Sequence, residues 1–281
     1  MKNLIYQYWN LIYQYWQGPL KPGIQSSTKL MKAYAEKIGA EYRFDHNIQI
    51  ASKTCNVPIY YEPANPLVDS SFDKYDNVAL IDIDVFPVEN LEEDLFEAHN
   101  GKDIGICTEP LQPHFRSIYN VANITSANDK RWCELLEKRW GIKYSYDKNN
   151  LPKVFNTGVM VFSKEGLRKA KAQWPSFQEY IDFVQVNQLP RFYFLYQDYA
   201  SAFMHYGDIE FEEMNNGWNS YMHKLGSKPN AKVNDTRTEE TKFVHIMFRT
   251  ADDWPEDALW GITNKPIKEW KLPVAANWPN D

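Results

Sequence analysis

Two aspartates at the end of an apolar run are the residues best suited to chemistry. Asp82 and Asp84 flank Ile83 and directly follow the run NVALI at residues 77–81. Alternate residues of a strand face the same side, so the two carboxylates are expected to point together at the carboxyl end of a strand, where open α/β sheets bind ligands. Carboxylates in an apolar setting are costly unless they are paired or bind a metal, and oxygen ligands suit Mg²⁺ or Mn²⁺, which in turn bind diphosphate. The pair therefore predicts a divalent metal site, with a helix N-cap or a solvated turn as the alternative.

The elements that would position this pair alternate between strands and helices, which predicts an α/β fold with a mostly parallel central sheet flanked by helices. No linker divides the chain, so we expect a single domain over residues 1–281, with an irregular C-terminal tail at about 255–281. Residues 55–75 and 108–128 are expected to be loops. Strands are expected at residues 11–16, 41–44, 77–86, 103–107, 154–162, 209–212 and 243–247, and helices at residues 26–38, 90–101, 128–140, 163–174, 176–186 and 197–206.

Composition excludes several classes of protein. The chain has 31 basic and 37 acidic side chains, a net charge of −6 and no basic tract, so it is not expected to bind duplex nucleic acid. The sequence contains no apolar run of about 18 residues, the length needed to span a membrane. The N-terminus does not have the pattern of a signal peptide. The three scattered cysteines suit neither a disulfide framework nor a zinc knuckle. The expected location is the cytoplasm.

The chain begins with a tandem repeat. The sequence NLIYQYW occupies residues 3–9 and again residues 10–16. A period of seven that occurs only twice is not a solenoid, so it is interpreted as a local duplication of one strand, of which only one copy need enter the sheet. We expect the second copy to do so, because it leads directly into the turn at Gly18-Pro19 and the first helix. Residues 1–10 are then a duplicated strand segment.

Four motifs follow one another along the chain: KYDNVALIDIDVFP (residues 74–87), FNTGVMV (155–161), Tyr196-Gln197-Asp198 and FVHI (243–246). In this order they resemble segments of the glycosyltransferases of the GT-A fold, the first of them the metal-binding strand. The resemblance is greatest to the glycogenin-like galactosyltransferase group, family eight. It spans most of the chain, from Leu11 to about Trp254. Tyr196 stands where the family has the first Asp of its D-Q-D segment, and Met247-Phe248-Arg249 stands where a Gly and a Lys-Pro-Trp usually follow the family's His.

The resemblance implies a single GT-A (Rossmann-like) domain and a metal-dependent hexosyltransferase. Such an enzyme moves a sugar from a nucleotide-diphosphate donor, most often a UDP-sugar, to a hydroxyl of a glycan or another acceptor, here with retention of configuration. Mn²⁺ or Mg²⁺ would be held by Asp82, Asp84 and His245. The other residues that it implies are Asp198 and Gln197 for catalysis and Asp82, Asn156, Gly158 and Arg249 for the donor. Position and residue type add Tyr15, or else Tyr13, at the end of the first strand, where an aromatic ring is expected to stack on the nucleotide base. Trp218 and Asn219 are expected to contact the acceptor, because aromatic faces pack on the apolar faces of sugar rings.

Each of these residues also has a structural interpretation. His245 would be a core histidine, Gly158 would mark a β-bulge rather than close approach of a ligand, and Asp198 would favour a helix N-terminus. Asn156 would cap a backbone group, and Trp218 would fill the core.

Three other functions remain as alternatives. A non-catalytic carbohydrate-binding module would also be rich in aromatic residues, which make up 15% of this chain. A sugar nucleotidyltransferase would need a Gly-rich loop with an Arg after the first strand, but residues 17–27 contain no Arg. A glycoside hydrolase needs two carboxyls across a cleft, which two aspartates side by side on one strand do not provide.

Overall fold

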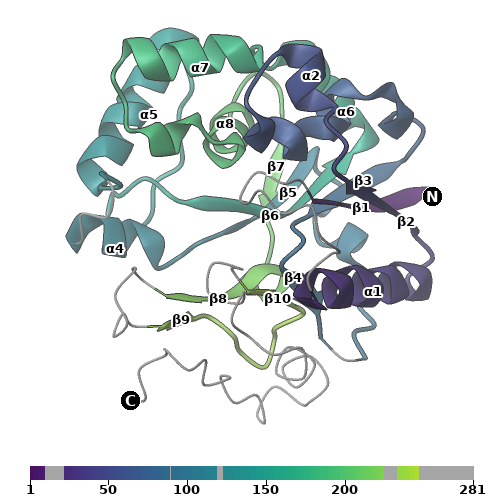
Figure 1. Ribbon diagram of the computed structural model, residues 1–281. Coiled ribbons are helices and arrows are strands. Elements are labelled where there is room, and N and C mark those ends of the chain that lie inside the picture. Colours follow the sequence, from purple (N-terminus) through teal and green to yellow (C-terminus); the bar gives the residue numbers. More distant parts are fainter. Residues whose placement is uncertain (10–21, 89, 119–122, 225–232, 247–281) are drawn as a thin grey trace.

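The computed structural model describes residues 1–9, 22–88, 90–118, 123–224 and 233–246 (Figure 1). Its six-stranded main sheet has the order β2-β1-β3-β6-β5-β7. Only β6 is antiparallel to its neighbours, so the predicted α/β fold with a mostly parallel central sheet is confirmed. The strands are β1 (Asn3–Trp9), β2 (Glu41–His46), β3 (Asn77–Ile81), β5 (Ile104–Thr108), β6 (Phe155–Ser163) and β7 (Phe211–Glu213).

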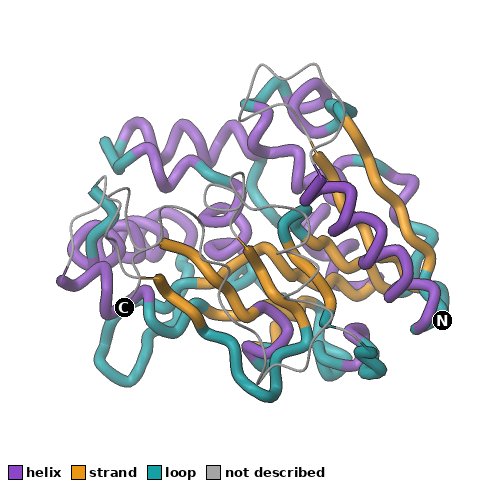
Figure 2. Tube along the Cα trace, turned by 60° about the horizontal axis from the view of Figure 1, so that its bottom comes forward, coloured by secondary structure: helices purple, strands orange, loops and turns teal. Residues whose placement is uncertain are grey.

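Helices surround this sheet, as Figure 2 shows with the strands in orange. Among the described residues, no helix is both long and apolar enough to cross a membrane. The cytoplasmic location stays a prediction. The α-helices are α1 (Pro22–Lys37), α2 (Ala51–Cys55), α3 (Asn65–Val68), α4 (Gln112–Ile118), α5 (Ser126–Trp140), α6 (Lys164–Gln173), α7 (Phe177–Val186) and α8 (Tyr196–Phe203).

The sheet is buried on both faces because alternate residues of its strands pack against different helices. In β3, Val78 and Leu80 belong to a core that includes residues of α5, α7 and α8. Ala79 and Ile81 belong to a second core that includes Met31 of α1. In Figure 1, α5, α7 and α8 lie on one side of the sheet and α1 lies on the other.

The chain leaves the main sheet at the two aspartates. β3 ends at Ile81, and β4 (Val85–Pro87) belongs to a second sheet of order β4-β10-β8-β9 (Figure 1). The prediction of one strand over residues 77–86 is therefore wrong: the backbone N–H of Val85 donates to the carbonyl oxygen of Asp82 at 3.2 Å and closes a turn. Two neighbouring carboxylates are too costly for a strand that is buried on both faces. The other strands of this sheet are β8 (Ser220–Lys224), β9 (Val233–Asp235) and β10 (Phe243–Ile246).

The first helix begins earlier than predicted, at Pro22 rather than at residue 26. Proline is favoured in the first helical turn because its fixed φ suits a helix and its missing N–H is not needed there. The hydroxyl of Ser27 donates to the carbonyl oxygen of Val85 at 2.9 Å, so it ties α1 to β4 instead of capping the helix.

Residues 90–101 do not form the predicted helix. Only a 3₁₀ turn at Leu95–Glu97 is helical, and Asn90 has a φ of 58°, in the left-handed region, whereas an N-cap residue is usually extended. The predicted loops at residues 55–75 and 108–128 contain the short helices α3 and α4.

The first copy of the repeat forms β1. The side-chain amide of Gln7 donates to the carbonyl oxygen of Asp82 at 3.0 Å, and Asn77 donates to the side-chain oxygen of Asn3 at 2.9 Å. The expectation that the second copy forms this strand is therefore wrong. Identical sequences have identical propensities, so the sequence alone could not decide between them. Residues 10–21, and with them the second copy, lie outside the described residues.

Deleting residues 10–16 is expected to leave the fold intact. The shortened chain keeps the whole of β1, and residues 17–21 remain as its connection to α1, a length typical of such loops. We expect the free energy of unfolding to change by no more than about 1 kcal/mol, measured by denaturant titration. A chain in which residues 10–16 are replaced by a Gly-Ser linker of equal length controls for loop length. Loss of the cooperative transition in the deleted chain would show that the second copy is needed for folding.

Candidate active site

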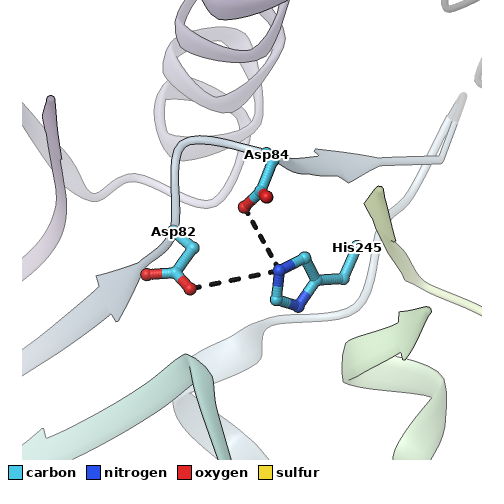
Figure 3. Close-up of side chains that lie close together, drawn as sticks. All are labelled: Asp82, Asp84 and His245. Atoms are coloured by element: carbon cyan, nitrogen blue, oxygen red, sulfur yellow. Dashed lines mark ion pairs between the residues drawn. The ribbon is translucent and has the colours of Figure 1, made fainter. Parts of the chain in front are cut away.

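Asp82, Asp84 and His245 converge at the carboxyl end of β3 (Figure 3). The two aspartates come from the turn between β3 and β4, and His245 comes from β10, where it is paired with Val85 of β4. His245 Nε2 lies 3.2 Å from Asp84 Oδ1 and 4.0 Å from Asp82 Oδ2. One ligand atom from each residue lies within 4.8 Å of the other two. The structure thus brings together the three residues that were predicted to bind the metal.

Backbone hydrogen bonds hold the turn in place. The N–H of Asp82 donates to the carbonyl oxygen of Gly158 in β6 at 2.8 Å, and the N–H of Ile246 donates to the carbonyl oxygen of Asp84 at 2.8 Å. The hydroxyl of Tyr8, at the end of β1, donates to Asp82 Oδ1 at 3.5 Å. Since both sheets contribute to these bonds, the carboxylates are held by rigid elements rather than by a free loop.

The charges in this cluster depend on one another. Burial and the negative charge of Asp84 raise the pKa of Asp82 to about 6, and His245 opposes this rise. Burial alone would lower the pKa of His245, but the charge and hydrogen bond of Asp84, together with the charge of Asp82, raise it to about 9. At neutral pH a protonated imidazole therefore offsets part of the negative charge of the two acids. Two carboxylate oxygens and an imidazole nitrogen around one point form a donor set that fits Mn²⁺ or Mg²⁺.

The stability of the metal-free protein is expected to fall as the pH rises from about 6.5 to about 9. The folded protein keeps the proton of His245 up to its pKa of about 9, whereas the unfolded chain loses it near 6.5. The folded state therefore binds more protons in this window, and the free energy of unfolding decreases with pH. Thermal unfolding in the presence of a chelator measures the effect, and His245→Gln should give a flatter profile. Parallel profiles for the two proteins would contradict the raised pKa.

A chain of side-chain hydrogen bonds supports His245 on the side away from the acids. His245 Nδ1 lies 3.0 Å from Asn219 Oδ1, and Asn219 Nδ2 donates to Asn156 Oδ1 at 3.0 Å. Asn156 Nδ2 in turn donates to Glu109 Oε1 at 2.6 Å. All four side chains are buried. Glu109 was not predicted from the sequence, although it follows β5 as Asp82 follows β3, and an acid at the carboxyl end of a buried parallel strand is a signal that could have found it.

Gly158 lies directly beside this chain. A Cβ on Gly158 would overlap His245 Cε1 and would lie 2.6 Å from His245 Nδ1 and 2.8 Å from Asn156 Oδ1. The pairing of β5 with β6 also shifts at this point, between Ile106 and Cys107. The bulge and the close approach that the sequence left open are thus both present, but the group that approaches is the histidine ring.

Asp198 and Gln197 lie in the first turn of α8, and neither belongs to the Asp82–Asp84–His245 cluster. Asp198 is buried, its Oδ2 has no hydrogen-bond partner among the described residues, and burial raises its pKa well above the usual range in spite of the positive charge of Arg116. Arg116 is engaged with Asp129, its Nη1 lying 3.0 Å from Asp129 Oδ1. Burial therefore disfavours the charged form of Asp198.

The residues predicted for the acceptor are internal. Trp218 is 4% exposed, and its ring packs edge-on against Phe243 with centroids 5.3 Å apart. Asn219 is fully buried and belongs to the hydrogen-bond network behind His245. Contact of these residues with an acceptor stays a prediction. Tyr15 and Arg249, predicted for the donor, lie outside the described residues; in β1, the position that corresponds to Tyr15 is held by Tyr8.

Comparison with known proteins adds a likeness of architecture. No family model and no curated protein matches the chain. The structure is similar to the galactosyltransferase LgtC in complex with donor and acceptor sugar analogs, with 13% identity, coverage of 97% of this chain and 98% of that chain, and a TM-score of 0.47. It is also similar to mouse xyloside xylosyltransferase 1 (14% identity, 87% and 96% coverage, TM-score 0.47).

A third similar structure is a glycosyltransferase involved in the glycosylation of the major capsid of PBCV-1, with 11% identity, 92% and 99% coverage, and a TM-score of 0.41. The solved structures named here are thus glycosyltransferases, the class that the motifs of the sequence resemble. Because their TM-scores lie below 0.5, they carry no conclusion about what this chain does, and the assignment of function depends on its own residues.

Proposed function

We propose that this protein is a metal-dependent glycosyltransferase that moves a sugar from a nucleotide-diphosphate donor to an acceptor hydroxyl, with retention of configuration. The observation that carries the proposal is the Asp82–Asp84–His245 cluster at the carboxyl end of a parallel strand, the place where open α/β sheets bind ligands. The resemblance of the surrounding segments to GT-A glycosyltransferases supports it.

Asp82, Asp84 and His245 would hold Mn²⁺ or Mg²⁺. When bound, such an ion acts as a Lewis acid that neutralises the departing nucleoside diphosphate. The residues of this chain do the remaining work: the two carboxylates orient the ion from the turn, and His245 must give up its Nε2 proton before it can bind. We expect a UDP-sugar as donor, with Asp82, Asn156, Gly158, Arg249 and Tyr15 near it, and a glycan or another hydroxyl compound as acceptor.

A base must also accept the proton of the acceptor hydroxyl during transfer. An inverting transfer needs a side-chain base, and the candidate is Asp198, whose burial raises its pKa and so disfavours its charged form. A retaining transfer can use the leaving phosphate instead, so the burial of Asp198 favours retention. In this proposal Asp198 and Gln197 lie near the anomeric carbon, Gln197 orients the acceptor, and Trp218 and Asn219 shape the acceptor side.

Calorimetric titration with UDP in the presence of Mn²⁺ tests the proposal. Heat that disappears on addition of a chelator, together with slow hydrolysis of one nucleotide sugar in a screen, is the expected result. Binding of a glycan without nucleotide or metal would instead indicate a carbohydrate-binding module. Release of pyrophosphate from a nucleoside triphosphate and a sugar 1-phosphate would indicate a nucleotidyltransferase.

A further inference from the structure

The hydrogen bonds behind His245 have a fixed direction, which begins at Glu109. A carboxylate only accepts hydrogen bonds, so Asn156 must turn its NH₂ group toward Glu109, at 2.6 Å. The opposite end of the same amide agrees with this direction, because the backbone N–H of Gly158 donates to Asn156 Oδ1 at 2.8 Å. Without Glu109, this one bond would have to hold the amide, and its NH₂ group would lose its partner.

The direction is passed on to the histidine. Asn156 Oδ1 is an acceptor, so Asn219 must present its NH₂ group to it, and Asn219 Oδ1 is left facing His245 Nδ1 at 3.0 Å. Two acceptors cannot form this bond, so Nδ1 must carry a hydrogen. The neutral histidine then has its lone pair on Nε2, the nitrogen that faces Asp84 at 3.2 Å.

We propose that Glu109 is a positioning residue that fixes the tautomer of His245 through Asn156 and Asn219, and so keeps Nε2 free to bind a divalent ion. The inference rests on the metal site of the proposed function. It adds a carboxylate that touches neither the ion nor the donor but acts through two amides. Hydrogen-bond partners of a ligating histidine orient its ring and set which nitrogen binds, and their loss typically lowers metal affinity by about 10–100-fold.

Two substitutions of Glu109 separate hydrogen bonding from charge. Glu109→Leu removes the acceptor, and we expect the affinity for Mn²⁺ alone, measured by calorimetry, to fall by about 10–100-fold. Glu109→Gln removes the charge but can still turn an oxygen to Asn156, so its affinity should stay within about threefold of the wild type. Equal losses in both variants would show that Glu109 acts by charge and would overturn the proposal, as would no loss in either.

Asn219, in the middle of the hydrogen-bond network from Glu109 to His245, offers a second test should Glu109→Leu not fold. Asn219→Leu is expected to lower Mn²⁺ affinity as Glu109→Leu does, and the double variant should lose little more than either single one, because both break one chain. Additive losses would contradict the proposal. Glu62→Leu serves as control, since Glu62 is a buried carboxylate that accepts hydrogen bonds from Ile50 and Ser52 and has no part in this chain. Its affinity should not change.

The tautomer can be observed without metal. In ¹⁵N-labelled protein with chelator at about pH 10, above the pKa of about 9 of His245, two-bond ¹H–¹⁵N spectra should show hydrogen on Nδ1 in the wild type and a mixture in Glu109→Leu. Hydrogen on Nε2 in the wild type would overturn the proposal. This measurement also distinguishes the two proposals: a wild type that has Nδ1–H but binds no Mn²⁺ would contradict the function and leave the role of Glu109 in place.

Discussion

Asp84→Asn is expected to lower the affinity for Mn²⁺ by about 100-fold or more and to abolish metal-dependent transfer, while the protein still folds. Asp84 supplies the oxygen that lies 3.2 Å from His245 Nε2, and asparagine has the same shape without the charge. Loss of a residue that only hydrogen-bonds to a metal ligand typically lowers metal affinity by about 10–100-fold. Loss of a ligand itself should therefore lower the affinity by at least the upper end of that range. Calorimetry with Mn²⁺ and turnover of the donor at saturating metal give the two values.

Asp76→Asn is the matched control for this prediction. Asp76 precedes β3 as Asp82 follows it, so the same chemical change is made at the opposite end of one strand. Its Oδ2 accepts a hydrogen bond from the backbone N–H of Lys2 at 2.7 Å, and the side-chain oxygen of asparagine can accept the same bond. Mn²⁺ affinity and turnover should therefore be those of the wild type. A fully active Asp84→Asn protein would refute the metal role of the cluster.

The sequence predicted the members of the cluster better than their setting. Asp82 and Asp84 were predicted as alternate residues of one strand, and they lie in the turn where the chain passes from the first sheet to the second. They still point at one place because β10 places His245 opposite the turn. The second sheet was not predicted, because it joins β4 to strands that lie far along the chain, and short strands with distant partners have little local signal.

The central β3 and the helices α5, α6 and α7 were predictable, since an apolar run and an amphipathic period are local patterns. The chain from Glu109 to His245 was not. Its four side chains come from separate segments, and their meaning depends on the direction of each hydrogen bond rather than on residue type. The choice between the two copies of the repeat was beyond prediction for a different reason, because identical sequences have identical propensities.

Gly158→Ala is expected to have the other large effect, on both stability and metal binding. Its Cβ would overlap the ring of His245 and crowd Asn156 Oδ1 at 2.8 Å. The ring has little room to yield, because Asn219 holds Nδ1 and β10 pairs with β4 and β8 on either side. We expect a cost of about 1–3 kcal/mol in the free energy of unfolding, as for other overpacked cores. A ring displaced by even ~1 Å should lower metal-dependent turnover by about 100-fold.

Gly105→Ala separates these two effects. Gly105 lies in β5, and a Cβ there would also be crowded, at 2.7 Å from His99 Cβ and 2.8 Å from Met214 Sδ, but its nearest atoms belong to residues outside the cluster. Both variants should unfold at lower denaturant concentration than the wild type, whereas only Gly158→Ala should lose Mn²⁺ affinity. If Gly158→Ala bound Mn²⁺ like the wild type, the position of the His245 ring would not matter to the ion. His245 would then be a core histidine, and the site would consist of the two aspartates alone.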